Sequence, residues 1–206
     1  MAETERPQIY LITPPVFEPD VFPDLLAGVL DAIEIACLRL SLATRDEDAL
    51  ARAADALRPV AHARDVALVI ESHAILAARL GLDGVHLTDG ARSVRRMRKD
   101  LGADAIIGAF CGTTRHEGIN AAEAGADYVA FGPVGATPLG DGRQAPQDLF
   151  EWWSEMIEVP VVAEGALTPE ITRDFAPFTD FFGIGEEIWR EADAVAAIRR
   201  LTAPFG

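Results

Sequence analysis

The chain has 206 residues, of which 50% are hydrophobic, and its formal net charge is −15 at pH 7. This length and composition predict one globular domain with a large core and exclude a disordered chain. The excess of acidic side chains disfavours nucleic acid as a partner, because nucleic acids are themselves polyanions. No apolar run approaches the length that spans a bilayer, and no apolar export segment follows the charged start of the sequence. We therefore expect a cytoplasmic protein with no membrane partner.

Apolar runs suited to buried strands alternate with helical patterns along the chain. The runs are continuous or nearly so, as expected for strands of a parallel sheet that is covered on both faces. They comprise Ile9–Thr13, Ile33–Leu40, Val66–Ile70, Gly84–Leu87, Ala105–Gly108, Tyr128–Phe131, Val159–Ala163 and Asp180–Ile184. The helical patterns comprise roughly Phe22–Ala32, Asp46–His62, Ala74–Leu80, Ser93–Leu101, Glu117–Ala124, Pro146–Met156, Thr168–Phe175 and Asp193–Leu201. Ser93 and Thr168 are expected to cap the helices that they begin.

Three junctions between a helix and the next strand have nearly the same sequence. Gly81-Leu-Asp-Gly-Val85, Gly102-Ala-Asp-Ala-Ile106 and Gly125-Ala-Asp-Tyr-Val129 each indicate a helix stop, a tight turn and the start of a buried strand. This repetition predicts a repeated helix-to-strand unit, which produces a parallel sheet because parallel strands need crossover connections. In such folds, function is expected at the carboxyl ends of the strands.

Eight strands that alternate with eight helices, without a linker or a change in composition, predict a (β/α)8 TIM barrel of the α/β class. We expect a single compact domain over residues 1–206, with residues 1–8 as an N-terminal extension. The alternative is an open doubly wound sheet, but no Gly-x-Gly-x-x-Gly motif follows the first strand to support its dinucleotide-binding form. The longest irregular segment, residues 132–145, would overhang the mouth of the barrel, and Arg143 is its one cation.

Some side chains have an ordinary structural interpretation beside a functional one. Cys37 and Cys111 form no disulfide framework or zinc pattern, so we expect small buried residues rather than reactive thiols. His86 lies within an apolar strand, where a core histidine is favoured over an acid–base group. Trp152 and Trp153 share one predicted helix. At least one of them is expected to pack against the barrel, and the other would suit a subunit contact in a homo-oligomer.

From Ile9 to about Ile188, the chain resembles the family of thiamine phosphate synthase and thiazole tautomerase. The resemblance is carried by Gly81-Leu-Asp-Gly-Val-His-Leu87, Ile106-Ile-Gly108, Gly125-Ala-Asp-Tyr-Val-Ala-Phe-Gly-Pro-Val134 and Pro160-Val-Val-Ala163. It implies a small (β/α)8 barrel with a site for a phosphorylated thiazole and, in the synthase, for a pyrimidine diphosphate with Mg²⁺. The synthase joins the two rings and releases pyrophosphate.

The second and third strands depart from the pattern that this resemblance implies. The family's Gln-Leu-Arg-x-Lys, which holds the diphosphate, is Cys37-Leu38-Arg39-Leu40-Ser41 here, so that Arg39 is kept and Ser41 replaces the Lys. The family's Asn-Asp after the third strand, whose Asp binds Mg²⁺, is Glu71-Ser72.

The segments after the fourth and sixth strands depart as well. An ungapped alignment places Ala91 where the family has a second magnesium-binding Asp, although Asp89 stands two residues earlier. In the irregular segment after the sixth strand, the family's Lys falls at Gly140, while Thr137 is kept. The resemblance therefore implies Mg²⁺ as a cofactor, whereas these replacements argue against it.

The last two strands end in acidic residues. The family's phosphate-binding Gly-Gly-Ile turn is Gly165-Ala166-Leu167, preceded by Glu164, and its phosphate-binding Ser after the eighth strand is Glu186, followed by Glu187. A carboxylate at such a position repels phosphate and removes a hydrogen-bond donor.

The acidic replacements share one sign of charge, and two interpretations of them stay open. If Glu71, Glu164, Glu186 and Glu187 converge, the mouth is an anionic cup suited to a metal ion or an organic cation. Otherwise they point outward or pair with arginines such as Arg39 and Arg143. The candidate catalytic residues are Arg39, Glu71 and His73. The candidate ligand-binding residues are Arg39, Glu71, Asp89, Thr137, Glu164, Gly165 and Glu186, and Glu71 and Asp89 are the candidate metal ligands.

Two functions of different classes follow. The first, implied by the resemblance, is an enzyme of thiamine metabolism that couples a pyrimidine diphosphate to a thiazole phosphate. The second is a non-catalytic or repurposed barrel that binds a different small molecule or a cation, or that serves as an interaction module. The fold alone does not choose between them, because barrels support many activities.

Overall fold

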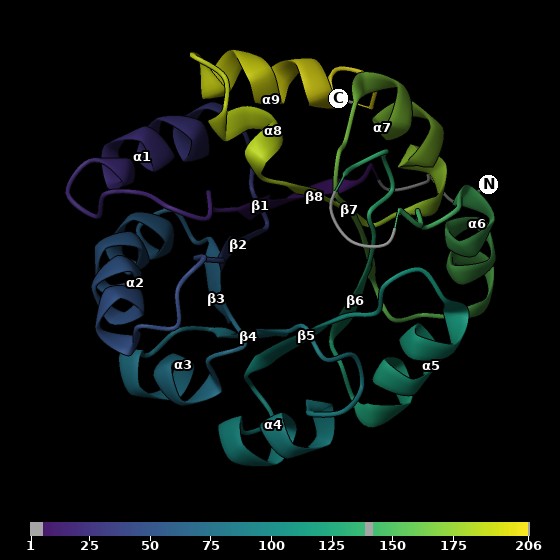
Figure 1. Cartoon of the computed structure of the whole chain (residues 1–206), viewed down its shortest axis with the longest axis horizontal. Coiled ribbons are helices and arrows are strands. Elements are labelled where there is room, and N and C mark those ends of the chain that lie inside the picture. Colours follow the sequence, from purple (N-terminus) through teal and green to yellow (C-terminus); the bar gives the residue numbers. More distant parts are fainter. Residues whose placement is uncertain (1–5, 139–141, 206) are drawn as a thin grey trace.

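The computed structural model describes residues 6–138 and 142–205 and forms a closed barrel of parallel strands. Each strand pairs with its neighbour in chain order, and the last strand pairs with the first (Figure 1). The strands are β1 (Gln8–Ile12), β2 (Cys37–Leu40), β3 (Ala67–Glu71), β4 (Gly84–Leu87), β5 (Ile106–Phe110), β6 (Tyr128–Phe131), β7 (Val161–Glu164) and β8 (Phe181–Ile184). The predicted (β/α)8 barrel is therefore confirmed, and the open sheet is excluded.

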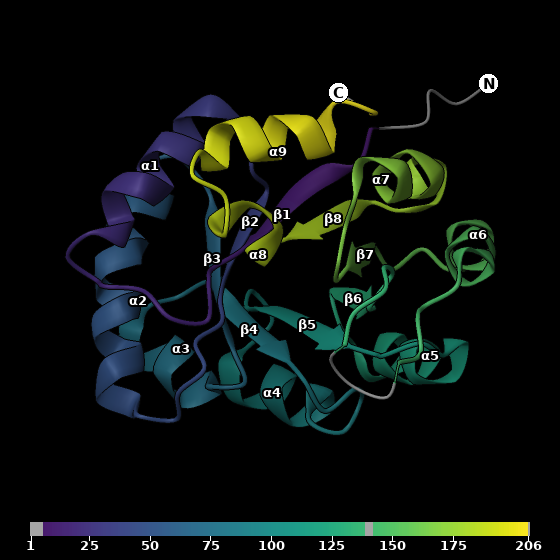
Figure 2. The ribbon, with the colours of Figure 1, turned by 45° about the horizontal axis from the view of Figure 1, so that its top comes forward.

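Helices surround the barrel on its outer face (Figures 1 and 2). They are α1 (Phe22–Ala32), α2 (Glu47–His62), α3 (Ala74–Leu80), α4 (Val94–Leu101), α5 (Arg115–Ala124), α6 (Gln147–Met156), α7 (Pro169–Phe175), α8 (Glu186–Trp189) and α9 (Ala194–Thr202), with a 3-10 turn, η1 (Ala176–Phe178), after α7. Both views place α8 between α9 and the ends of β1 and β8. Within the described ranges, no helix has the length and apolar character needed to cross a bilayer.

Two details differ from the expectations. β1 begins at Gln8, so the strand includes the last residue of the expected N-terminal extension. Thr168 caps α7 by accepting a hydrogen bond from the backbone N–H of Ile171, but Ser93 does not cap α4. The Ser93 hydroxyl instead donates to the carboxylate of Asp89 at 2.7 Å, and its backbone is already helical (φ −100°, ψ −10°), a geometry unlike that of a capping residue.

The repeated Gly-x-Asp junctions have a common structural role at the amino ends of β4 and β6. Asp83 donates its N–H to the carbonyl of Leu68 (2.9 Å) and accepts the Leu68 N–H on its carboxylate (2.7 Å). Asp127 makes the same pair of bonds to Ile107, at 2.8 and 2.6 Å. Asp180, before β8, repeats the arrangement on Val161. Each Asp thus ties the start of one strand to its neighbour and sets their register.

Two apolar cores result from the alternation of side chains along the strands. Outward-facing residues such as Leu38 and Leu40 pack under the helices, where Trp153 of α6 is also fully buried, as expected for one of the two tryptophans. Inward-facing residues fill the barrel itself, and they comprise Tyr10, Cys37, Val69, Tyr128, Ala130 and Val162 with partly buried neighbours. Burial raises the pKa of Cys37 and of Cys111 to about 12, which agrees with inert buried thiols.

Candidate functional site

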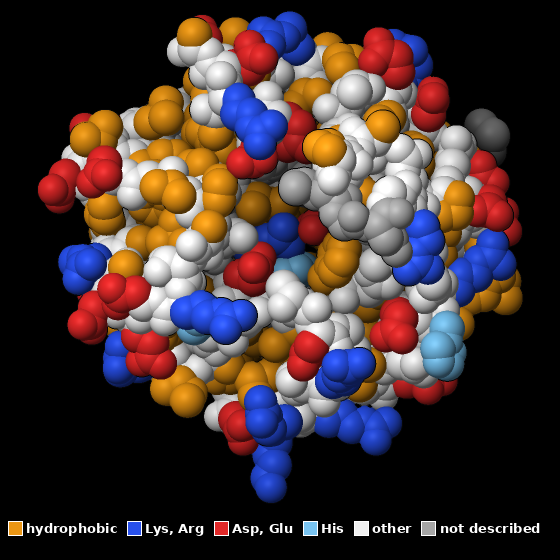
Figure 3. Space-filling model, in the orientation of Figure 1, with side chains coloured by type: hydrophobic (Ala, Val, Ile, Leu, Met, Phe, Trp, Pro, Cys, Tyr) orange, Lys and Arg blue, Asp and Glu red, His pale blue; other side chains and the backbone are white. Residues whose placement is uncertain are grey.

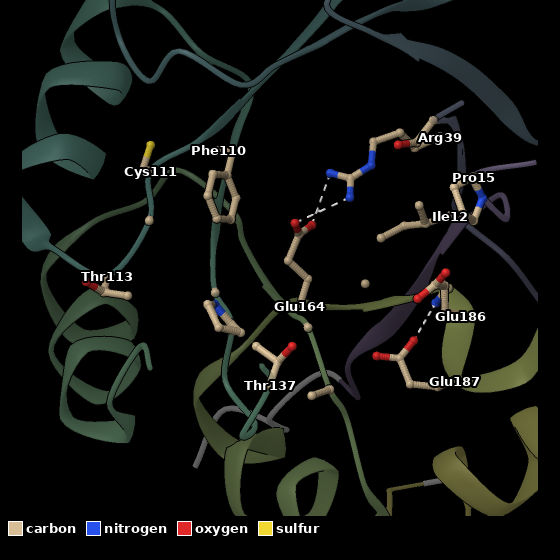
Figure 4. Close-up of a pocket in the computed structure, with 18 of the residues that line it drawn as sticks. Ile12, Pro15, Arg39, Phe110, Cys111, Thr113, Thr137, Glu164, Glu186 and Glu187 are labelled. Carbon is tan, nitrogen blue, oxygen red and sulfur yellow. Dashed lines mark hydrogen bonds and ion pairs between the residues drawn. The ribbon is translucent and has the colours of Figure 1, made fainter. Parts of the chain in front are cut away.

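A buried ion pair forms the floor of the barrel mouth. Arg39 points inward from β2, and Glu164 points inward from the end of β7 (Figure 4). Arg39 Nη1 lies 3.1 Å from Glu164 Oε2, and Nη2 donates to Glu164 Oε1 at 3.3 Å. The two side chains are only 7% and 14% exposed. The one cation that points into the barrel from β2 is therefore already matched by a carboxylate of the same chain.

Glu71, at the end of β3, lies on the other side of Arg39. It accepts a hydrogen bond from the Ser41 hydroxyl at 2.8 Å, and its Oε2 is 4.0 Å from Arg39 Nε. Within the described ranges, Arg39 Nε has no hydrogen-bond partner. Glu164 Oε2 has none either, because its contact with Arg39 Nη1 is an ion pair without hydrogen-bond geometry. Burial lowers the pKa of Arg39, but Glu164 and the other acidic neighbours raise it by more, so the guanidinium stays charged.

A chain of polar side chains supports Arg39 from below. Arg39 Nη1 donates to His86 Nε2 at 2.7 Å, and His86 Nδ1 lies 2.9 Å from the hydroxyl of Tyr128, which is 2.6 Å from that of Tyr10. Because arginine only donates, His86 Nε2 must accept, and the imidazole is neutral with its proton on Nδ1. Burial, followed by the charge of Arg39, lowers the pKa of His86 well below its usual value. His86 is thus a buried structural histidine, as expected.

This network depends on a glycine in β5. A Cβ atom at Gly108 would lie 1.9 Å from Cζ of Tyr128, so only glycine leaves room for the ring. The Tyr128 ring of β6 therefore fills the space that a side chain at Gly108 would take inside the barrel. This position brings the Tyr128 hydroxyl to His86.

A cavity of about 1370 Å³ opens above the floor, and Figure 3 shows acidic, basic and histidine side chains gathered in this hollow. Apolar walls come from Ile12, Pro15, Phe110 and Pro133. The charged lining residues of the described part of the chain are five glutamates and three arginines, namely Glu117, Glu164, Glu186, Glu187, Glu191, Arg39, Arg143 and Arg190. The mouth is therefore acidic on balance, and its charges are mixed.

The loops after β7 and β8 are joined by one carboxylate. Glu187 accepts hydrogen bonds from the backbone N–H of Gly185 at 2.8 Å and of Leu167 at 3.2 Å (Figure 4 shows the Gly185 bond). Its neighbour Glu186 forms an ion pair with Arg190 one turn further along the chain. The helix α8 that carries both glutamates is anchored by Trp189, whose Nε1 donates to the carbonyl of Ile12.

The irregular segment after β6 begins by pairing with the end of β7 through backbone hydrogen bonds. Val134 N–H donates to the carbonyl of Glu164 and Gly135 N–H to that of Gly165, both at 3.0 Å. Thr137 and Arg143 then line the cavity, as expected for a segment that overhangs it. Gly140, the aligned position of the family's lysine, lies outside the described residues.

The structure gathers most of the predicted site residues but not all of them. Arg39, Thr137, Glu164, Gly165 and Glu186 line the cavity of about 1370 Å³, and Glu71 reaches it through Ser41 and Arg39. Asp89 and His73 instead line a separate pocket of about 560 Å³ beside α3 and α4, together with Ser72 and Arg96. His73 Nδ1 is bound to the carbonyl of Glu71 at 2.7 Å.

The candidate magnesium ligands fit the ion poorly. Glu71 is turned toward Ser41 and Arg39, while the Asp89 carboxylate is bound by Ser93. Across the described ranges, no group of three or more His, Cys, Asp or Glu side chains could hold a metal ion. Mg²⁺ is usually held by one or two carboxylates together with water and substrate phosphates, but here the two candidate carboxylates are turned to other partners and do not share a cavity.

Sequence reasoning missed some members of the site. Tyr10 and Tyr128 gave no signal as a hydroxyl pair, and the bonds of Glu187 to two loops depend on the short helix α8, which no periodicity indicates. For the inner face of the barrel, the sequence offered a signal at β2: Cys37, Arg39 and Ser41 alternate along the chain, which places all three on the same face.

Taken together, the fold and the mouth define a single-domain (β/α)8 protein with a ligand-sized cavity at the carboxyl ends of its strands. A model of the thiamine monophosphate synthase family matches residues 9–199. The chain therefore belongs to the thiamine monophosphate synthase family.

Relatives and solved structures agree with this assignment. The chain is 41% identical over 192 residues to a thiamine-phosphate synthase of Rhodospirillum centenum, covering 92% of this chain and 93% of the relative. It is 38% identical over 209 residues to a thiamine-phosphate synthase of Erythrobacter litoralis, covering 97% and 96% of the two chains. The solved structure of a thiamine phosphate pyrophosphorylase from Pyrococcus furiosus matches with a TM-score of 0.81 at 20% identity, over 96% of this chain and 95% of that one, and supports the fold.

Proposed function

We propose that this chain binds a small ring-bearing molecule of thiamine metabolism whose polar end is uncharged or cationic, and that it supports little ring coupling. One observation carries the proposal: a cation and two backbone N–H groups at the mouth that could hold a phosphate or diphosphate are already occupied by carboxylates of the same chain. Arg39 is paired with Glu164, and two backbone donors are bound by Glu187.

Occupied donors weaken anion binding for two reasons. A diphosphate needs cations, Mg²⁺ or converging N–H groups, and it would have to displace Glu164 to reach Arg39, or Glu187 to reach the N–H groups of Leu167 and Gly185. Displacement would also leave carboxylates close to the bound phosphate, where like charges repel. Glu71 and Asp89 do not share a cavity, so these two carboxylates do not form one Mg²⁺ site.

The remaining lining suits a different ligand. Phe110, Ile12, Pro15 and Pro133 offer apolar contacts to a flat ring, and the excess of glutamates over arginines in the lining, five against three, favours an amine or another cation over an anion at its edge. The family membership indicates thiazole or pyrimidine rings as the relevant class of ligand.

A cytoplasmic location and a homo-oligomeric state remain predictions from the sequence.

A second candidate function is the synthase reaction itself, which the 41% identity to a thiamine-phosphate synthase favours. On this alternative, Arg39 would leave Glu164 to hold the diphosphate. Losing one well-placed charged donor costs about 2–4 kcal/mol of transition-state stabilisation, or roughly two to three decades in rate, so the replacement of the family's lysine by Ser41 predicts slow turnover.

Thermal shift measurements test the first proposal. The unphosphorylated thiazole alcohol, the unphosphorylated aminopyrimidine, Mg²⁺ and pyrophosphate would each be added to the wild type, to Glu71→Gln and to Glu186→Gln. We expect an unphosphorylated ring compound to raise the melting temperature by mass action, and pyrophosphate to have no effect. Stabilisation by pyrophosphate alone would contradict the proposal, and no response to any compound would favour the interaction module.

A turnover assay separates the two candidates. The purified protein would be mixed with the pyrimidine diphosphate, the thiazole phosphate and Mg²⁺, and pyrophosphate release would be followed beside an ordinary synthase. Comparable rates would establish the second candidate and overturn the first.

A further inference from the structure

Two backbone N–H groups from different loops converge on one point at the β7–β8 side of the cavity. Leu167 N belongs to the loop after β7, and Gly185 N to the loop after β8; both residues are buried. Buried N–H groups need partners, and here both partners are oxygens of the Glu187 carboxylate. The two donors form a small anion seat, and the chain fills it with its own side chain.

The loops are built to bring backbone close to the seat. Gly165 has φ +92°, and a Cβ atom there would lie 2.9 Å from Pro133. At Gly183 a Cβ atom would lie 2.8 Å from Cβ of Glu164. A larger residue at Gly165 would clash with the segment after β6, and one at Gly183 would clash with Glu164 of β7, so the two glycines keep the backbone close on this side of the cavity.

The second feature of this cavity is its buried cation, which the chain's own carboxylates also match. Arg39, whose side chain is 7% exposed, lines the same cavity, and its Nε has no hydrogen-bond partner in the part of the chain that the structure describes. An anionic ligand would find this guanidinium matched by Glu164 and Glu71 and the two-donor backbone seat filled by Glu187.

We propose that Glu187 is a specificity-determining residue that occupies this seat and thereby excludes phosphate groups from it. Its carboxylate makes the charge-assisted bonds that a phosphate oxygen would otherwise make, and it repels a second anion. The inference deepens the proposed function and rests on it for the class of ligand, since a ligand accepted here must meet Glu187 with an uncharged or cationic group.

The test compares three proteins with inorganic phosphate as the probe. Glu187→Ala empties the seat, and Glu186→Ala is the matched control, because it removes the same charge from the adjacent residue, whose carboxylate pairs with Arg190 instead. In calorimetric titrations, we expect Glu187→Ala to bind phosphate at least about tenfold more tightly than both the wild type and Glu186→Ala. Phosphate should also raise the melting temperature of Glu187→Ala alone.

Amide hydrogen exchange gives a second readout. In Glu187→Gln, which keeps the shape of the side chain and guards against a folding failure of the alanine variant, the amides of Leu167 and Gly185 should exchange faster than in the wild type. Equal phosphate binding by all three proteins, an equal gain in Glu186→Ala, or unchanged exchange of these amides in Glu187→Gln would overturn the proposal. If the wild type binds no ring compound while Glu187→Ala gains phosphate, the proposed function fails and the role of Glu187 stands.

Discussion

Replacing Glu164 by Gln tests whether the buried ion pair holds the floor of the mouth together. Gln keeps the volume of the side chain, so the variant removes a charge without opening a cavity. Arg39 is 7% exposed and would remain a buried cation whose counter-charge within residues 6–138 and 142–205 is Glu71, 4.0 Å from its Nε. Breaking a buried pair by removing one partner costs about 3–5 kcal/mol, and the nearby Glu71 places this case at the lower end, about 3 kcal/mol.

Equilibrium unfolding in urea measures this cost as a loss in the free energy of unfolding. Thermal unfolding gives a second measurement: for a chain of this length, 1 kcal/mol corresponds to about 2–4 °C, so the melting temperature should fall by about 6–12 °C. The double variant Arg39→Met with Glu164→Gln removes the cation as well and should be more stable than Glu164→Gln alone. Glu186→Gln, whose partner Arg190 is 73% exposed, should unfold almost as the wild type does. A cost below about 1 kcal/mol for Glu164→Gln, or additive effects in the double variant, would refute the reasoning.

Two further predictions concern the barrel interior and its amino end. Because the pKa of His86 is lowered in the folded state, the unfolded chain binds an extra proton below pH of about 6.5, and stability should fall with decreasing pH by about 1.4 kcal/mol per unit from this group. The free energy of unfolding in urea, measured between pH of about 7.5 and 5.5, should therefore change less steeply with pH in His86→Gln than in the wild type, whereas the exposed His116→Gln should follow the wild type. An equal dependence of stability on pH in all three proteins would contradict the assignment. Asp180→Ala leaves the N–H of Val161 without its partner and should cost about 1–2 kcal/mol, whereas Asp104→Ala, at the repeated junction without this bond, should cost little.

The sequence predicts the barrel well because the local signals agree with the global topology. The Gly-x-Asp repeat marks real junctions, and at Asp83 and Asp127 the acidic residue ties neighbouring strands together. At Asp104 the same letters make no such bond, since β5 begins two residues later, at Ile106. The pattern alone does not distinguish these cases, because the partner N–H belongs to the preceding strand.

The site was less predictable because its contacts join distant parts of the chain. The alternating positions of β2 place Arg39 inside the barrel, but nothing local shows that its partner is Glu164, 125 residues away. The hydroxyl pair of Tyr10 and Tyr128 spans 118 residues. The family resemblance drew attention to the acidic strand ends, but only the closed barrel shows that Glu187 binds backbone donors.

Calorimetric titration of the wild type with the thiazole alcohol and with its phosphate ester tests the central claim most directly. The claim is that the chain's own carboxylates occupy the groups that would hold phosphate. It predicts that the alcohol binds at least as tightly as the ester, because the ester's phosphate finds Arg39 paired and the seat filled by Glu187. Binding of the ester at least about tenfold tighter than the alcohol, a difference of about 1.4 kcal/mol, would contradict the account.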